Sequence, residues 1–391
     1  MTVYGTRPEA IKLAPLIASL DAHPHLSSTP VITGQHLEML SQVNTVFGIE
    51  PRHDIAVFEP GMPLTRLAGK TTEAMGTLLR AERPDAVLVQ GDTTSALAAG
   101  LAAFCEQIPV IHLEAGLRTA SIATPFPEEG NRRMLSQITT LHLAPTPAAR
   151  ENLVRSGVDQ GDIVVTGNTV IDALHSTVAR RADYTDPALS GLDVDPRRVV
   201  LVTSHRRESW GEPMRRVAGA LAELARRRDD VLFVLPLHAN PAVTTVFTEA
   251  LSGRPNVLLT SSLAYPDMCR VLNRCTLVIT DSGGLQEEAP ALGKPVLVLR
   301  DDTERPEAVA AGTALLVGTG PTVIIGETER LLDDTDAYAR VARAQNPFGD
   351  GHAAARCTAA VASLFDLAER LPDFDPTAGH SPMPHPTQEP R

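Results

Sequence analysis

The sequence lacks the features that would place it in a membrane or on nucleic acid. No apolar run approaches the ~20 residues that a membrane-spanning helix needs, and residues 1–5 show no basic region followed by an apolar stretch, as a signal peptide would. The 35 Lys and Arg residues are outnumbered by 47 Asp and Glu, giving a formal net charge of −12 without a basic cluster. We therefore expect a cytoplasmic protein that binds neither membranes nor nucleic acid.

Cysteine is also scarce. The four cysteines include no Cys-x-x-Cys pair and no neighbouring histidine at metal-ligand spacing, so the sequence predicts no metal site there. We expect buried free thiols at Cys105, Cys269, Cys275 and Cys357. The pair Asp301 and Asp302 has no further oxygen ligands nearby and does not indicate a cation site.

The dominant pattern is a short apolar run followed by a stretch of helical period, repeated along the chain. Such runs, alternating with helices, are typical of parallel strands that are covered on both faces. The predicted strands are 30–33, 86–90, 110–114, 141–144, 163–166, 199–203, 231–235, 257–259, 277–280, 296–299 and 315–317. Residues 8–20 are typical of a helix with one apolar stripe, and Pro8 suits its first turn.

Two such series predict an α/β protein with two doubly wound domains facing a cleft. We expect an N-terminal domain over 1–170, a C-terminal domain over 171–350, a helix over 351–370 that packs back on the N-terminal domain, and a disordered tail over 371–391. The first apolar run, 2–4, is so short that we expect either a start upstream of Met1 or a short edge strand.

Ligands of open α/β sheets bind at the carboxyl ends of strands, and polar residues follow several predicted strands of the first series. Arg7 and Lys12 lie at a glycine turn that opens a helix, which indicates either an anion site or an ordinary turn with a surface arginine. Asp92 is either functional or a helix cap. Glu114 ends an apolar strand, where a buried carboxylate is costly without a partner, so it is either functional or held by Arg118 in a structural ion pair. Glu128 falls in the first turn of a predicted helix.

The second series ends its strands in basic and glycine-rich segments. His205, Arg206 and His238 follow two of these strands. A third strand leads into the segment Ser282-Gly283-Gly284 at the start of a helix, where backbone N–H groups and the helix dipole can hold a phosphate. Glu288, one turn further on, can accept hydrogen bonds from the hydroxyls of a ribose. This division between carboxylates and a diphosphate site is typical of chemistry on a nucleotide-sugar.

These segments together resemble the non-hydrolysing bacterial UDP-N-acetylglucosamine 2-epimerases, in order and with matching spacing over residues 3–370. The matching segments are 5–12 (GTRPEAIK), 91–94 (GDTT), 112–119 (HLEAGLRT), 127–132 (PEEGNR), 167–169 (GNT), 205–208 (HRRE), 281–290 (DSGGLQEEAP) and 303–307 (TERPE). The resemblance implies a GT-B-like fold, a homodimer, and reversible conversion of UDP-GlcNAc to UDP-ManNAc without NAD or a metal. The implied route eliminates UDP to a 2-acetamidoglucal and adds it back to the other face.

The resemblance also implies residue roles. It makes Asp92, Glu114 and Glu128 the acid/base set, with Asp92 and Glu128 as the preferred pair, and His205 an aid to the departure and return of UDP. We expect clustering of these carboxylates to raise the pKa of at least one. The implied UDP-binding residues are Arg7, Lys12, Arg206, His238, Ser282, Gly283, Gly284, Glu288 and Arg305.

The chain departs from the family pattern in two places. Met268 stands where some relatives have an aromatic residue near the uracil, and it would cover the base less specifically. An allosteric UDP-GlcNAc site in the family is built around a pair like Gln35 and His36, but Glu38 stands where a second glutamine is expected. A carboxylate there would repel a diphosphate.

Three other functions stay open at this point. A hydrolysing epimerase would share the elimination step but release UDP and free ManNAc. A GT-B glycosyltransferase using a UDP-sugar would need an acceptor cleft and would not need three carboxylates on the N-terminal domain. A catalytically inactive nucleotide-sugar sensor would not need Asp92, Glu114, Glu128 and His205 together.

Overall fold

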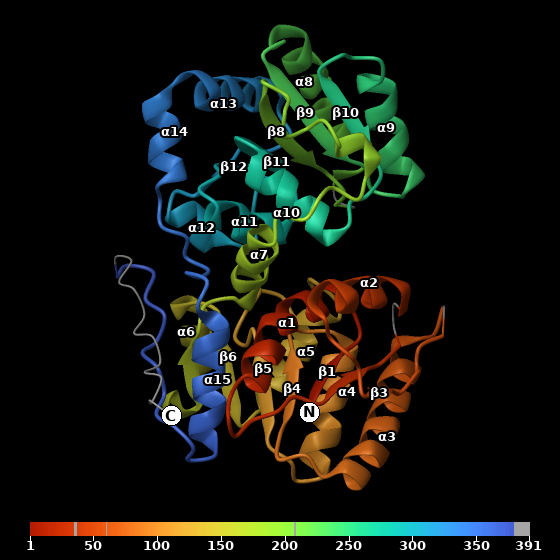
Figure 1. Ribbon diagram of the computed structural model, residues 1–391, viewed down its shortest axis with the longest axis vertical. Coiled ribbons are helices and arrows are strands. Elements are labelled where there is room, and N and C mark those ends of the chain that lie inside the picture. The colour runs from red at the N-terminus through yellow and green to blue at the C-terminus, as the bar shows by residue number, and fades with distance from the viewer. Residues whose placement is uncertain (35–36, 60, 207–208, 379–391) are drawn as a thin grey trace.

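The computed structural model describes residues 1–34, 37–59, 61–206 and 209–378, and it contains two parallel sheets (Figure 1). The first sheet has the order β3-β2-β1-β4-β5-β6-β7 and the second the order β10-β9-β8-β11-β12-β13. The strands are β1 (Thr2–Tyr4), β2 (Pro30–Ile32), β3 (His53–Asp54), β4 (Val87–Gln90), β5 (Val110–Leu113), β6 (Leu141–Ala144), β7 (Ile163–Val165), β8 (Arg198–Thr203), β9 (Val231–Pro236), β10 (Val257–Thr260), β11 (Leu277–Thr280), β12 (Val296–Val298) and β13 (Ala314–Leu316).

Helices connect the parallel strands, as the sequence pattern predicts. They are α1 (Arg7–Asp21), α2 (Leu37–Phe47), α3 (Leu64–Glu82), α4 (Thr94–Cys105), α5 (Glu128–Leu135), α6 (Pro147–Arg155), α7 (Thr169–Ala179), α8 (Glu212–Arg227), α9 (Pro241–Leu251), α10 (Tyr265–Arg274), α11 (Gly283–Ala291), α12 (Pro306–Ala310), α13 (Pro321–Asp333), α14 (Thr335–Ala342) and α15 (Ala353–Leu364). Each of the eleven predicted strands is present to within about one residue at each end. The short β3 was not predicted.

The short strand β1 is not an edge strand, so the edge-strand alternative was wrong. It pairs in parallel with β2 on one side and with β4 on the other. Thr2, Val3 and Tyr4 are all buried. Three residues suffice in the middle of this sheet because both neighbouring strands and the helices on either face supply the packing.

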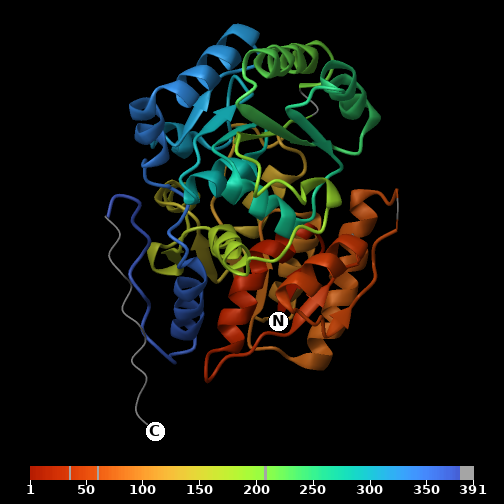
Figure 2. The same cartoon turned by 45° about the horizontal axis from the view of Figure 1, so that its top comes forward.

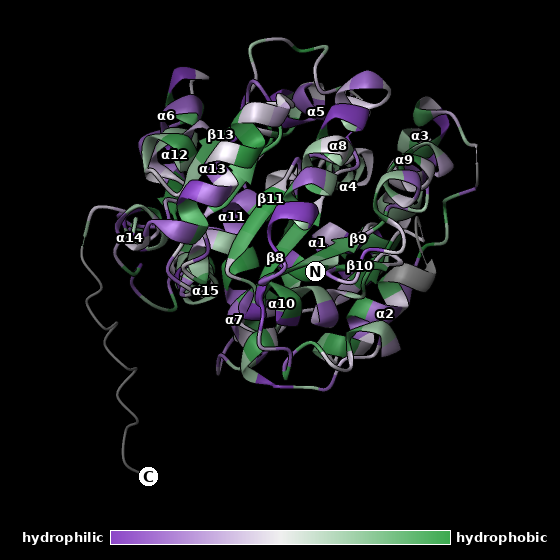
Figure 3. Ribbon diagram, turned by 90° about the horizontal axis from the view of Figure 1, so that it is seen from above, coloured by the Kyte–Doolittle hydropathy of each residue, from purple (hydrophilic) through white to green (hydrophobic). Residues whose placement is uncertain are grey.

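The core of the molecule follows from the apolar strands and helix stripes (Figure 3). On α1, the predicted stripe of Ile11, Leu13, Leu16, Ile17 and Leu20 is buried.

No helix of the described residues is long and apolar enough to cross a membrane. Three of the four cysteines are buried free thiols, but Cys105 at the end of α4 is exposed, which corrects the prediction for that residue.

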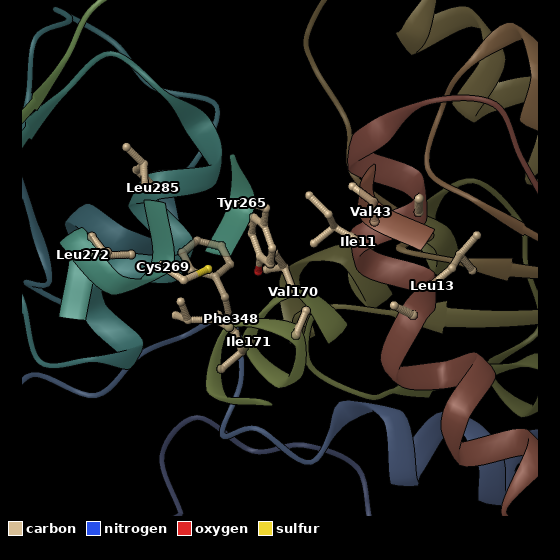
Figure 4. Packing of buried hydrophobic residues seen from close by; sticks show 14 of the residues in the cluster. Ile11, Leu13, Val43, Val170, Ile171, Tyr265, Cys269, Leu272, Leu285 and Phe348 are labelled. Carbon is tan, nitrogen blue, oxygen red and sulfur yellow. The ribbon is translucent and has the colours of Figure 1, made fainter. Parts of the chain in front are cut away.

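We call β1–β7 with α1–α7 and α15 the N-terminal half, and β8–β13 with α8–α14 the C-terminal half. Helix α7 lies between the halves and packs against α1 and α15 on one side and against α10 and α11 on the other (Figure 1). One core cluster runs through this junction, from Ile11 through Val170 and Ile171 to Tyr265 and Leu272 (Figure 4).

The chain returns to the N-terminal half at its end, where α15 packs against α1 and β6 (Figures 1 and 2). The predicted boundary of the disordered tail, residue 371, lies too early in the sequence, because the residues just after it are part of the fold. Phe374 is buried, its N–H donates to the carbonyl of Val165 at 2.7 Å, and Asp373 accepts from Val165 N–H. An edge strand, β7, thereby gains a covering segment. Residues 379–391 lie outside the described residues.

Candidate active site

The candidate site lies where the carboxyl ends of the two sheets meet. Among the described residues, three hydrogen bonds cross between the halves there: Asn168 Nδ2 to Glu287 Oε2 at 2.7 Å, Thr146 Oγ1 to Glu307 Oε1 at 3.3 Å, and Arg7 to the carbonyl of Leu263 at 3.4 Å. A pocket of ≈ 380 Å³ opens between the halves, and its walls include Arg132 from α5 and Arg305 from the loop before α12. Both halves therefore contribute to one site, as the topology requires.

The turn after β1 places two cations in this site. Glu9 of α1 is buried and accepts the N–H groups of Gly5 and Thr6 at 2.9 and 2.7 Å, which fixes the start of the helix. One turn later, Lys12 Nζ lies 2.6 and 2.7 Å from the two carboxylate oxygens of Glu114. Lys12 thus serves first as the partner of a buried carboxylate. Arg118, expected in that position, donates instead to its neighbour's carbonyl and to Ser136.

Glu114 follows β5, and its carboxylate accepts hydrogen bonds from side chains of three different segments of the chain. Besides Lys12, Gln90 Nε2 and Asn168 Nδ2 donate to it, the latter at 3.1 Å. Its φ of 63° lies in the left-handed region that side-chain-bearing residues seldom adopt. Burial alone would raise the pKa of Glu114, but the charge and hydrogen bonds of Lys12 outweigh it and hold the pKa below its ordinary value. The expected rise in pKa therefore does not occur at this carboxylate.

Asp92 follows β4 and forms a two-point ion pair with Arg132 of α5, at 2.8 Å from Nε and 2.6 Å from Nη2. Asn131 Nδ2 also donates to its backbone carbonyl. The helix-cap interpretation of Asp92 is wrong, because the side chain of Thr93 caps α4 by accepting from Ala96 N–H. The carboxylate of Asp92 is thus held by a cation beside the pocket between the halves.

The two glutamates that open α5 differ sharply. Glu129 is fully buried and accepts from Arg133 at 2.7 Å, from Arg132 at 3.2 Å and from the N–H of Thr119 at 3.1 Å. Glu128 is half-buried, and among the described residues it has neither a hydrogen bond nor an ion pair on its carboxylate. The structure therefore gives Glu129 a supporting role and leaves Glu128 available for chemistry.

His205 follows β8 and is oriented by a buried aspartate. Its Nδ1 lies 3.1 Å from Asp281 Oδ1, while Asp281 Oδ2 accepts the N–H groups of His205 and Arg206 at 2.8 and 3.0 Å. Burial would raise the pKa of Asp281, but the hydrogen bond and charge of His205 hold it lower. The ring of His238 stacks on His205 at 6.1 Å between centroids. Nε2 of His205 is consequently the ring nitrogen left to act on a ligand.

The start of α11 has the form of an anion cradle. Ser282 is the residue before the helix, and Gly283 and Gly284 form its first turn. A methyl group on Gly283 would lie 3.5 Å from the guanidinium of Arg206 and 4.0 Å from that of Arg305, whereas one on Gly284 would meet nothing within 4 Å. Backbone N–H groups, a helix N-terminus and two guanidiniums thus converge, which suits a diphosphate.

Two glutamates on α11 face the junction differently. Glu287 is buried and pairs with Arg305 Nε. Glu288 is half-buried, and burial, reinforced by the charge of Glu287, raises its pKa to about 8, while Lys12 and Arg7 oppose the rise. Met268 on α10 is partly buried against the adjoining core. A carboxyl group that is easily protonated thus lies one turn inside the cradle helix.

Several residues of this site were not given roles from the sequence: Gln90, Arg132, Asn168, Asp281 and Glu287. All lie at strand ends or in the first turns of the following helices. Their position therefore indicated a place in the site, but their partners are distant in sequence.

Gln35 and His36 lie outside the described residues, as does the side chain of Glu38. Within the described part of the chain, no group of three His, Cys, Asp or Glu residues is arranged to hold a metal ion.

The comparisons with known proteins agree on one family. The family model for UDP-N-acetylglucosamine 2-epimerase matches residues 18–362. The UDP-N-acetylglucosamine 2-epimerase of Yersinia pestis is 46% identical over 363 residues, covering 91% of this chain and 96% of the relative. The crystal structure of the Neisseria meningitidis UDP-GlcNAc 2-epimerase bound to UDP-GlcNAc superposes with a TM-score of 0.83 at 41% identity, covering 93% of this chain and 98% of that one.

Two facing, doubly wound parallel sheets with the site between them define a two-domain α/β protein of the GT-B-like class. Within that class, the family match over most of the chain and the identity to curated relatives are decisive. The chain belongs to the UDP-N-acetylglucosamine 2-epimerase family.

Proposed function

We propose that this protein interconverts UDP-GlcNAc and UDP-ManNAc without hydrolysing them. The observation that carries the proposal is the division of the site: Asp92, Glu114 and Glu128 lie on the N-terminal half, and a diphosphate cradle with Arg206 and Arg305 lies on the other. Inversion at C2 needs proton transfer on the sugar and stabilisation of a leaving diphosphate. The two halves supply these two functions separately.

The C2 proton of the substrate is not acidic, because no carbonyl group is adjacent to it, so simple deprotonation is excluded. We propose instead that a carboxylate removes the C2 proton while the C1–O bond breaks, and the electron pair of that bond leaves with UDP. The product is a 2-acetamidoglucal. UDP then adds back to C1 while C2 receives a proton on the opposite face, so atoms and electrons balance in both directions.

We assign the proton transfers to Asp92 and Glu128, with Glu114 as the third member of the set. Asp92 forms a two-point ion pair with Arg132, which orients its carboxylate beside the pocket. Glu128 can take up or release a proton without breaking an ion pair. The N–H groups of the cradle, together with Arg206 and Arg305, stabilise the charge that develops on UDP. His205, oriented by Asp281, assists departure and return of UDP, His238 stacks beside it, and Arg7 and Glu288 contact the nucleotide.

Proton NMR of the purified protein with UDP-GlcNAc in D₂O tests the proposal directly. We expect UDP-ManNAc to appear with deuterium at C2, because the proton removed exchanges with solvent before another is delivered. Release of free ManNAc and UDP would establish the hydrolysing reaction instead. Transfer of the sugar to an acceptor without deuterium at C2 would establish a glycosyltransferase, and unchanged substrate that still binds would favour a sensor.

We further propose that the protein acts as a homodimer through α4 and α5, which pack against each other. Three apolar side chains on these helices are unusually exposed: Leu101 at 41%, Phe104 at 55% and Met134 at 53%. Ile122 and Phe126, in the loop before α5, are exposed as well. A cluster of this kind is typical of a surface that a second copy covers.

Light scattering on a size-exclusion column tests the dimer. We expect Phe104→Glu together with Met134→Glu to produce a monomer, because charges cannot be buried unpaired in an interface. Val194→Glu is the control, since Val194 is 85% exposed in the segment between α7 and β8, away from α4 and α5 in the sequence. A dimer that persists in the double variant would show that another surface forms the interface.

Four unpaired cysteines also suit the cytoplasm, where we place the protein.

A further inference from the structure

One side chain joins the proton-transfer residues to the diphosphate cradle. Asn168, the residue before α7, donates from Nδ2 to Glu114 Oε1 at 3.1 Å and to Glu287 Oε2 at 2.7 Å. Glu114 is on the N-terminal half and Glu287 is on α11 of the C-terminal half. The two hydrogens of one amide nitrogen can serve both carboxylates at once.

The orientation of this amide is fixed by the fold. Asn168 Oδ1 accepts the N–H of Val170 at 3.1 Å and so caps α7. Its backbone is held too, because its N–H donates to the carbonyl of Phe348 and Gly349 packs closely against it. With the oxygen occupied by the cap, only the nitrogen can face the two carboxylates.

The surrounding charges alternate. Lys12 of α1 pairs with Glu114, and Arg305 pairs with Glu287. The charge of Arg305 also acts on Glu114 and lowers its pKa. Of the other described groups near Glu114, Gln90 from β4 donates to it, and His112 lies on the preceding strand β5. Burial lowers the pKa of His112 to about 4, so its ring is neutral near pH 7. Glu114, Asn168 and Glu287, all buried, thus form a continuous chain with the partly exposed Arg305, which ends at the cradle.

We propose that Asn168 is a positioning residue that keeps Glu114 ionised and oriented, and that it does so by tying Glu114 through Glu287 to Arg305 of the diphosphate cradle. The proposal rests on the function proposed above only for the role of Glu114 in the reaction. The link between Asn168 and the ionisation of Glu114 is a property of the protein itself and can be measured without turnover.

The decisive variant is Asn168→Asp. Aspartate caps helices as well as asparagine does, so α7 should still form, but a third carboxylate now faces Glu114 and Glu287 where two donors stood. We expect the pKa of Glu114 to rise by about one unit or more. Asp334→Asn, which exchanges the same two residue types at the cap of α14 away from the site, is the matched control.

Carbon NMR of protein labelled at the glutamate carboxyl carbon measures this pKa, with the Glu114 signal identified by its absence in Glu114→Gln. An unchanged titration of Glu114 in folded Asn168→Asp would overturn the proposal. Where that variant does not fold, Asn168→Ser keeps a cap and removes the bridge. Its effect on the Glu114 titration should be non-additive with that of Glu287→Gln, and strict additivity would contradict the link.

Turnover gives the second readout. In an active enzyme, we expect Asn168→Asp to move the acidic limb of the kcat profile to higher pH by the same amount as the NMR titration, with KM for UDP-GlcNAc changed less than about threefold. A uniform loss of kcat at every pH would show a merely structural role. A wild-type protein that does not epimerise UDP-GlcNAc would overturn the proposed function, while the NMR titration would still decide the role of Asn168.

Discussion

At the scale of single residues, the site separates carboxylates that look alike in the sequence. Glu128 and Glu129 are neighbours, yet Glu129 is fully buried in ion pairs and Glu128 is unpaired among the described residues. Glu114 and Asp92 are each held by a cation from a different helix. The environment of each carboxylate, rather than its type, decides whether it supports the fold or can move a proton.

This distinction predicts the outcome of two substitutions. We expect Asp92→Asn and Glu128→Gln each to lower kcat by about 10²–10⁴-fold, the usual range for a general acid or base, with the dissociation constant of UDP nearly unchanged. Initial rates and calorimetric UDP titrations measure the two effects. Near-normal turnover in both variants would remove them from the proton-transfer set.

The raised pKa of Glu288 predicts that the stability of the folded protein depends on pH. Its pKa is about 8 in the folded protein against an ordinary value of 4.5, so the folded state binds the proton more tightly and stability falls as the pH rises between these values. We expect Glu288→Gln to raise the melting temperature over that of the wild type more at about pH 8.5 than at about pH 5. Glu249→Gln, on the exposed side of α9, controls for the loss of a charge; an equal effect from both variants would contradict the assignment.

At the scale of elements, the segment after α15 is part of the fold. Phe374 packs under the guanidinium of Arg356, 5.5 Å from its ring centroid, and Asp373 pairs with Arg150 of α6 at 2.9 Å. Together with its backbone bond to Val165, this segment covers the edge of the first sheet. The segment after α15 therefore stabilises the half that carries the candidate carboxylates.

Truncation at two different positions measures the contribution of this segment. We expect Phe374→Ala to lower the free energy of unfolding by about 3 kcal/mol, the usual cost of removing a buried phenylalanine, and removal of residues 371–391 to cost at least as much. A chain that ends at Ala378 retains these contacts and is the control. Equal denaturation midpoints for the chains ending at 370 and 378 would show that the segment adds no stability.

At the scale of the whole molecule, the candidate nucleotide site is shared by two halves that meet along α7. A ligand that binds this folded arrangement and not the unfolded chain must stabilise it, by about 2.7 kcal/mol at a hundred times its dissociation constant. We expect UDP to raise the melting temperature. In Gly283→Ala the melting temperature without UDP should be kept, because the added methyl makes only an ordinary contact at 3.5 Å, but the shift produced by UDP should shrink.

Gly326→Ala is the matched control for this measurement, because Gly326 also lies in a helix, α13, and a methyl group there meets nothing within 4 Å. It should respond to UDP as the wild type does. A full UDP shift in Gly283→Ala would mean that the diphosphate does not approach the start of α11.

The amino-acid sequence alone was enough to define the strands, the two parallel sheets and the segments that form the site. These are local properties: apolar runs, helical periods, and polar residues directly after a strand. Which charges meet was settled only by the packing of the folded chain. The pairing of Lys12 with Glu114 joins residues 102 positions apart, and the bridge from Asn168 to Glu287 spans 119. Such partners are set by the packing of α1, α7 and α11 at the junction, which no local pattern encodes. For the same reason, the order of strands in the first sheet, and not the length of β1, decided that β1 lies inside it.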